Sequence, residues 1–135
     1  LIDQLRRSGY GIHIGNVFLG GILYADDIVL ASCTCNGLQT LINVCFNYSI
    51  RWDIVFNTQK SLVSTFGGRC PQSSRIMLND VPLSWSHRVK YLGCTFICNA
   101  GRIDIKQAVG KFYSSLNNIL SVLGRNRMRL WLSIL

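Results

Sequence analysis

The sequence contains no glutamate, and its six acidic residues are all aspartates. Fourteen lysines and arginines oppose them, which gives a formal net charge of +8 and a pI near 9.5. Such a basic excess in a chain of 135 residues predicts a polyanionic partner, either nucleic acid or an anionic membrane surface. Charged residues make up only 15% of the chain and hydrophobic residues 49%, a balance that argues against intrinsic disorder.

The chain also lacks the long apolar segments that membrane insertion or secretion requires. Two uncharged runs are long enough to consider, 8–25 and 28–50. The first contains five glycines, and the second carries polar residues at helical spacing, as an amphipathic helix on a core does. No apolar run with a small-residue cleavage site follows the N-terminus. We therefore expect an intracellular protein, nuclear or cytoplasmic, that is not secreted and has no membrane partner.

The six cysteines lack the paired C-x2-C spacing of zinc modules. They occur as Cys33-x-Cys35, Cys94-x3-Cys98 and two isolated residues. Without a secretory context a disulfide framework is also disfavoured, so we expect mostly buried thiols in a reducing compartment.

Apolar periodicity predicts helices and strands in alternation, without repeats or low-complexity segments. The expected helices cover 1–8, 36–52 and 105–123, with Thr34 or Asn36 capping the second, Asp104 capping the third and Gly124 ending it. The runs 17–24 and 28–31 predict a hairpin with acidic residues at its tip. Further strands are expected at 53–56, 61–66, 75–78, 81–85 and 89–97.

The chemistry is concentrated in Tyr24-Ala25-Asp26-Asp27, between the two strands of the expected hairpin. Carboxylates at the end of rigid strands can face a metal while the strands bury their apolar sides. Hard oxygen ligands suit Mg²⁺, which binds through one or two carboxylates together with substrate phosphates. The alternative is an Asp-Asp turn that is simply solvated and binds no metal. Judged by the apolar flanking runs alone, the two interpretations have about equal weight.

Residues 24–31 (YADDIVLA) resemble the catalytic hairpin of reverse transcriptases, in the form used by non-LTR (LINE-type) retrotransposons. Other segments follow in the order of that family. Residues 1–5 and 9–12 resemble the helix and glycine turn before the hairpin, 37–42 the helix after it, 56–61 the segment with the palm lysine, 89–93 the primer-grip segment, and 102–123 the first thumb helix.

The resemblance implies an α+β fold. It consists of a partial reverse-transcriptase palm, an antiparallel sheet with packed helices, over 1–97 and the start of a helical thumb over 98–135. It also implies RNA-directed DNA polymerisation by two-metal nucleotidyl transfer, with Mg²⁺, or Mn²⁺ as an alternative, and with deoxynucleoside triphosphates, an RNA template and a DNA primer. The implied catalytic residues are Asp26, Asp27 and Lys60, of which the two aspartates bind metal; the implied nucleic-acid contacts are Tyr24, Ala25, Leu92 and Gly93.

Two-metal chemistry needs a further carboxylate, which in this family lies upstream of the hairpin, and Asp3 does not match it. We therefore expect a fragment that depends on the rest of the polymerase polypeptide and is inactive alone. The alternatives are a non-catalytic, basic nucleic-acid-binding remnant and a pseudogene product.

The positive charge is concentrated near the C-terminus, where the residues from 99 onward carry +5 of the net +8. A thumb helix beside a duplex would use Lys106 and Lys111 for phosphate contacts, although a solvated basic face explains any single cation as well. Trp52, Trp85 and Trp131 are expected in the core.

Overall fold

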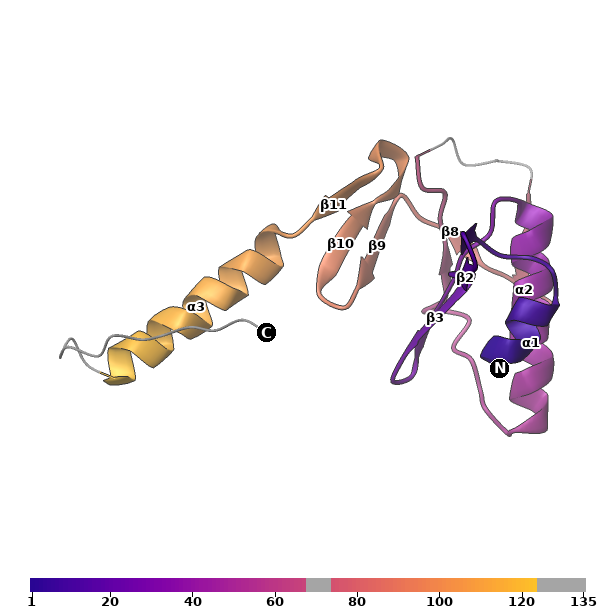
Figure 1. Ribbon diagram of the computed structural model, residues 1–135, viewed down its shortest axis with the longest axis horizontal. Coiled ribbons are helices and arrows are strands. Elements are labelled where there is room, and N and C mark those ends of the chain that lie inside the picture. Colours follow the sequence, from indigo (N-terminus) through magenta and orange to yellow (C-terminus); the bar gives the residue numbers. More distant parts are fainter. Residues whose placement is uncertain (68–73, 124–135) are drawn as a thin grey trace.

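A computed structural model describes residues 1–67 and 74–123 of the chain (Figure 1). Its elements follow one another as α1 (Ile2–Arg7), β1 (His13–Ile14), β2 (Val17–Phe18), β3 (Gly21–Tyr24), β4 (Asp27–Leu30), α2 (Cys35–Arg51), β5 (Leu62–Val63), β6 (Met77–Leu78), β7 (Val81–Pro82), β8 (Ser84–Trp85), β9 (Arg88–Tyr91), β10 (Cys94–Ile97), the 3-10 turn η1 (Cys98–Ala100), β11 (Arg102–Asp104) and α3 (Lys106–Leu123).

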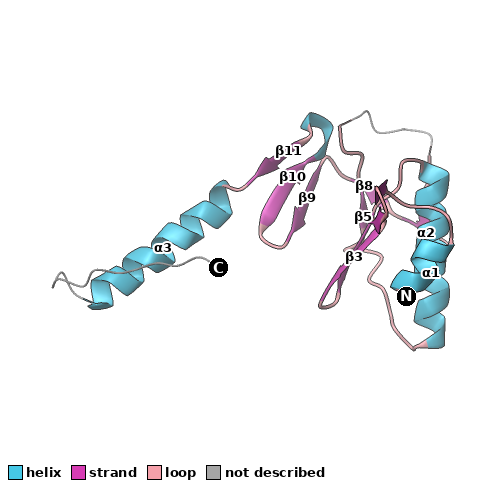
Figure 2. Cartoon of the chain, in the orientation of Figure 1, coloured by secondary structure: helices cyan, strands magenta, loops and turns pink. Residues whose placement is uncertain are grey.

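The strands form small sheets, most of them antiparallel hairpins of neighbours in the sequence (Figure 2). The pairs β1–β2, β3–β4 and β6–β7 are two-stranded, β9, β10 and β11 form a three-stranded antiparallel sheet, and β5 pairs with β8 in parallel. The mixture of helices and mainly antiparallel strands confirms the α+β class. The three-stranded sheet contains residues from both sides of residue 97.

Helix α2 organises the core. The Thr34 hydroxyl accepts a hydrogen bond from the Gly37 N–H at 3.0 Å, which confirms Thr34 as the cap. The apolar face of α2 contributes to two buried clusters, and α1, β4 and β6 pack against this helix. One cluster contains Leu5, Leu41 and Cys45; the other contains Ile42, Val63, Ile76, Leu78 and Leu83.

Several expected strands differ from the structure. Residues 53–56 contain no strand, since α2 ends at Arg51 and Asp53 adopts a left-handed backbone with φ of 53°. Residues 89–97 form two strands instead of one. Trp52 is 60% exposed and stacks on Tyr48 rather than lying in the core. Trp85 is half-buried, and Trp131 and Gly124 lie outside the described residues.

A side-chain amide joins α2 to β6. Gln39 donates from Nε2 to the Met77 carbonyl oxygen at 2.9 Å, and its Oε1 accepts from the Met77 N–H at 2.8 Å. Gln39 therefore satisfies both backbone groups of Met77, as a residue of a neighbouring strand would.

Replacing Gln39 by Ala is expected to lower the free energy of unfolding by about 1–3 kcal/mol, because a partly buried donor and acceptor lose their partners. Urea unfolding followed by circular dichroism measures the change. The control is Gln107→Ala on the exposed side of α3, expected to change stability by less than about 0.5 kcal/mol. Equal effects of the two substitutions would show that the Gln39 hydrogen bonds contribute no net stability.

Helix α3 extends away from the helices α1 and α2, and the sheet β9–β10–β11 lies between them (Figure 1). Its apolar side chains are largely exposed, among them Val109, Phe112, Ile119 and Leu120, as is Ile105 just before the helix. Within the described ranges, none of the helices is both long and apolar enough to cross a bilayer.

Candidate functional site

The acidic motif occupies the turn of the β3–β4 hairpin. Tyr24 and Asp27 are cross-strand partners, so Ala25 and Asp26 form the two-residue connection between the strands. The structure places Asp27 at the start of β4, one residue beyond the tip where the sequence pattern puts both acids. All four residues are exposed, Tyr24 by 60%. In the described part of the chain neither carboxylate has a hydrogen-bond or ion-pair partner, so both are available to a ligand.

The base of the hairpin is fixed in the core. Leu30 at the end of β4 packs against both buried clusters, and it pairs with the buried Gly21 of β3. A Cβ on Gly21 would lie 2.9 Å from Leu5 Cδ1, so any larger residue at this position would have to displace the Leu5 side chain of α1. The two strands therefore carry the exposed carboxylates on a firmly anchored support.

The backbone of the turn is strained at Ala25, whose φ is 51°. This left-handed region is favourable for glycine and tolerable for asparagine or aspartate, whereas alanine pays a steric penalty between its Cβ and the backbone. A residue held in such a conformation costs about 1–3 kcal/mol and is found preferentially at functional sites.

A second strained turn connects β9 to β10. Tyr91 pairs with Cys94, and the intervening Leu92 and Gly93 have φ of 47° and 80°. Positive φ at both positions is the type I′ arrangement, which matches the twist of the flanking strands. Leu92 is 52% exposed. Among the described non-glycine residues with positive φ, Ala25 and Leu92 are the two that are neither asparagine nor aspartate.

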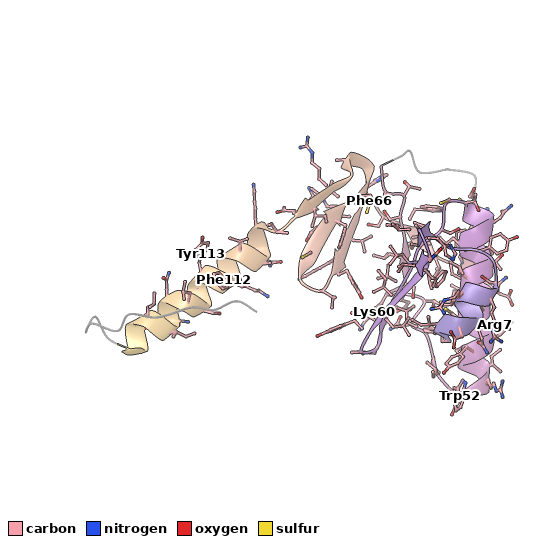
Figure 3. The ribbon with its side chains drawn as sticks, viewed as in Figure 1. Arg7, Trp52, Lys60, Phe66, Phe112 and Tyr113 are labelled. Carbon is pink, nitrogen blue, oxygen red and sulfur yellow. The ribbon has the colours of Figure 1, made fainter. Side chains whose placement is uncertain are left out.

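Lys60 lies in a turn that Asn57 organises. Asn57 Oδ1 accepts hydrogen bonds from the Gln59 and Lys60 N–H groups at 3.0 and 3.1 Å, and its carbonyl oxygen accepts from Ser61. Phe56, just before the turn, packs against both core clusters. The Lys60 side chain is exposed, and Figure 3 draws it close, in projection, to the β3–β4 hairpin.

The two candidate lysines of α3 are also exposed. Asp104 Oδ1 accepts a hydrogen bond from the Lys106 N–H at 3.0 Å, at the start of the helix. Because α3 begins at Lys106, the N-cap position belongs to Ile105 and not to Asp104, which ends β11 one residue earlier. The prediction of Asp104 as the cap is therefore wrong by one residue, although its side chain does bond the first N–H of the helix. Lys111 lies beside the exposed aromatic pair Phe112 and Tyr113, whose ring centroids are 5.7 Å apart (Figure 3).

The structure brings together only part of the expected site. The four residues of the acidic motif share one hairpin tip, while Lys60, the Leu92–Gly93 turn and the α3 lysines lie on other elements. In the described part of the chain no hydrogen bond or ion pair joins these places, and no three His, Cys, Asp or Glu side chains form a group that could hold a metal. Asp26 and Asp27 supply two exposed carboxylates, which fits Mg²⁺ held jointly with phosphates and water.

The cysteines in the described residues are free thiols. Cys33 is exposed and Cys45 is buried against Leu5 and Leu41. Burial raises the pKa of the Cys45 thiol from its ordinary value of 9.0 to about 11, since the low dielectric of the core disfavours the thiolate.

Iodoacetamide at pH 8 is accordingly expected to alkylate Cys33 at least about 100-fold faster than Cys45, because two pKa units lower the thiolate fraction about 100-fold and burial restricts access further. Peptide mass spectrometry gives both rates, and labelling in concentrated urea is the control that should equalise them. Similar rates in the folded protein would show that Cys45 is not held in the core.

Two features of the site carry no clear signal in the sequence. Alanine has no preference for positive φ, so nothing at position 25 indicates the strained turn. Leu-Gly is also unlike the Asn-Gly or Asp-Gly pairs that mark type I′ hairpins, so 89–97 has the pattern of one strand with a bend. The Gly93 position is the only local indication of the turn.

Comparison of the chain with protein-family models, with curated proteins and with solved structures finds no match.

Proposed function

We propose that the chain is part of the palm, and the start of the thumb, of a non-LTR retrotransposon reverse transcriptase, and that it contributes the metal-binding hairpin of an RNA-directed DNA polymerase. The observation that carries the proposal is the position of Tyr24-Ala25-Asp26-Asp27 on an anchored hairpin whose exposed turn is strained at Ala25. A positive φ is usual at the first position of a two-residue hairpin turn, but glycine, asparagine or aspartate normally occupies it. The alanine here carries a steric cost, which is often found at sites that present a side chain in a fixed direction.

The proposed metal chemistry depends on the side chains exposed at the turn of the β3–β4 hairpin. Asp26 is the principal metal ligand in this proposal, and Asp27, at the first position of β4, assists it. Mg²⁺ bound there supplies charge for activation of a primer hydroxyl and for neutralisation of a triphosphate. Tyr24 presents its ring beside the primer terminus, and the small Ala25 side chain leaves room for the duplex.

In this proposal Lys60, in the 57–61 turn, acts as a general acid and not as a metal ligand. An ammonium group can donate a proton to pyrophosphate as it leaves. The Lys60 N–H donates a hydrogen bond to Asn57 Oδ1, which fixes the backbone there, and the exposed Lys60 side chain is the proton donor in this proposal.

The Leu92–Gly93 turn supports the same function. Both hairpin turns point to the lower side of the view in Figure 1. Backbone groups at such a turn project from the sheet and can contact the primer, in the manner implied for the primer-grip segment. Completion of the metal site needs a carboxylate from a neighbouring strand, so the rest of the polymerase polypeptide is a partner in this proposal.

The test is a chimera in which residues 1–135 replace the corresponding palm and thumb segment of an active non-LTR reverse transcriptase. We expect Mg²⁺-dependent extension of a DNA primer on an RNA template. A folded chimera that binds the template–primer duplex but adds no nucleotide would overturn the catalytic proposal, and would favour the alternative of a non-catalytic nucleic-acid-binding remnant.

A further inference from the structure

A pocket of about 280 Å³ lies at the C-terminal end of α2. Its wall combines the last turns of α2, the residues that follow the helix and the tip of the β6–β7 hairpin. Figure 3 labels Trp52 at this end of the helix. A space of this volume is small for a drug-sized ligand and suits one ring with a short side chain. We call it the α2-end pocket, and most of its lining consists of apolar side chains: Phe46, Ile50, Ile54, Val55, Phe56 and Leu78.

The end of α2 turns the chain back to form this pocket. Asp53 adopts a left-handed backbone with φ of 53°, and the Ile54 N–H donates to the Ser49 carbonyl oxygen at 2.9 Å. This is the hydrogen bond of a Schellman motif, which ends a helix and redirects the chain. Phe56 packs against both core clusters and Leu78 is buried, so the inner wall of the pocket is fixed in the core.

The outer wall of the pocket exposes apolar surface to solvent. Ile50 is 66% exposed and Val55 is 91% exposed. Removal of apolar surface from water is favourable in rough proportion to the area that is covered. A ligand with an apolar ring therefore gains free energy by covering these two side chains.

One charged group lies among the polar residues of the lining. Of the described residues that line the pocket, Asp53 is the one with an ionisable side chain. Its carboxylate has no hydrogen-bond or ion-pair partner in the described ranges, although the exposed Arg51 precedes it by two residues. Thr58 and Asn79 add a hydroxyl and an amide to the lining. The pocket thus combines an apolar wall with an unpaired carboxylate.

The electrostatics of this end of α2 favour a cation. The C-terminal end of a helix carries a partial negative charge, and the Asp53 carboxylate adds its own. Beside the lining residues in the sequence, Arg51 opposes this charge and Asp80 adds to it, but neither lines the pocket. The chain as a whole has a net charge of +8 and attracts anions. Preference for a cation would therefore be a property of this site and not of the overall charge.

We propose that the α2-end pocket binds a small organic cation, an amine attached to one apolar ring. The ring covers Ile50 and Val55, and the ammonium group lies against Asp53, where the Thr58 hydroxyl and the Asn79 amide oxygen can accept further hydrogen bonds. A protein partner fits less well, because a stable interface buries about 800 Å² on each side, far more than a pocket for one ring provides. The proposal does not depend on the polymerase function.

The test uses indole compounds that differ in charge: tryptamine is a cation, tryptophol is neutral and indolepropionate is an anion. Each is titrated into the full, isotope-labelled chain, and the shifts of backbone amide NMR signals give the dissociation constant and the place of binding. We expect tryptamine to bind with a dissociation constant of about 1 mM, as is usual for so small a ligand. The signals of Ile54, Val55 and Asn79 should shift. Tryptophol should bind about fivefold more weakly, because a charged hydrogen bond is stronger than a neutral one, and indolepropionate most weakly of all.

Asp53→Asn should abolish the preference for tryptamine over tryptophol while binding of tryptophol is retained. Asparagine tolerates the left-handed backbone at this position, so the turn after α2 is kept. Asp80→Asn is the matched control, because Asp80 also has a positive φ, of 58°, and lies beside Asn79 without lining the pocket. This control should keep the preference, and circular dichroism verifies that both variants fold. Equal effects of the two substitutions would overturn the proposal.

A measurement on the unmodified chain keeps the proposal testable if Asp53→Asn does not fold. Raising sodium chloride from about 20 mM to about 500 mM should weaken tryptamine binding about threefold and leave tryptophol binding nearly unchanged, since salt screens the charged contact. Equal salt dependence of the two compounds, tightest binding by indolepropionate, or shifts confined to other residues would each overturn the proposal. A Gly-Trp-Arg peptide amide that binds at least about tenfold more tightly than tryptamine would overturn it in favour of a protein partner. Asp26→Asn should not change tryptamine binding, so this proposal and the polymerase proposal can fail separately.

Discussion

Replacing Asp26 by Asn is expected to lower primer extension by the chimera at least about 10³-fold, with little change in the amount of folded protein. The substitution keeps the size and shape of the side chain and removes the negative charge on which a metal ligand depends. Loss of several kcal/mol of transition-state stabilisation by the metal corresponds to a rate factor of this size.

The position of Asp26 separates the effect of the substitution on catalysis from an effect on folding. The residue is exposed and its carboxylate has no hydrogen-bond or ion-pair partner in the described part of the chain, so the substitution disturbs no contact there that holds the fold together. Extension should be measured in single-turnover reactions with Mg²⁺ and again with Mn²⁺. Thermal unfolding should give the same midpoint for the two proteins.

Asp80→Asn is the matched control. Asp80 also lies at the tip of a hairpin, between β6 and β7, with φ of 58°, and it is exposed. Asparagine tolerates this left-handed conformation as well as aspartate does, so the variant removes one carboxylate without straining the turn. Extension should be retained. If Asp26→Asn retains extension too, the hairpin is a solvated turn and has no part in catalysis.

Replacing Leu41 by Ala is expected to lower the free energy of unfolding by about 2–5 kcal/mol, the range found when a large buried side chain leaves a cavity. Leu41 is 0% exposed and contacts the cluster that joins α1, α2 and the base of the β3–β4 hairpin. A small domain is stable by only about 5–15 kcal/mol, so this loss is a large share of the total.

The control for Leu41 is Ile50→Ala on the same helix, where the side chain is 66% exposed. A change within about 0.5 kcal/mol is expected there. Urea unfolding followed by far-ultraviolet circular dichroism compares the two variants. Equal destabilisation would mean that the helix propensity of the substituted residues, and not the buried cluster, determines the difference.

The helices are the part of the fold that sequence pattern predicts best. Polar and apolar residues alternate with helical period over 36–50, and the Thr34 cap forms as expected. Near α3 the same kind of pattern is wrong by one residue: Asp104 bonds the Lys106 N–H, but it lies one residue before the N-cap position.

The strands are less predictable because their pairing depends on distant residues. Met77 lies in strand β6, and its N–H and carbonyl oxygen bond to the side chain of Gln39, 38 residues earlier in the chain. No local pattern contains that information. Likewise, 53–56 is rich in apolar residues and lacks a strand, because the chain turns at Asp53 directly after α2.

By itself the sequence determined the positive charge, the mixed helix and strand composition, and the chain positions of the acidic motif and the lysines. These properties depend on residue type and short spacing. Only the tertiary structure decided that Asp26 lies on a strained, exposed turn above a buried base, and that Arg88, Lys90 and Arg102 share one face of one sheet. The reason is that strand register and backbone strain are set by contacts between residues far apart in the chain, and one residue of shift in register would turn each side chain to the other face.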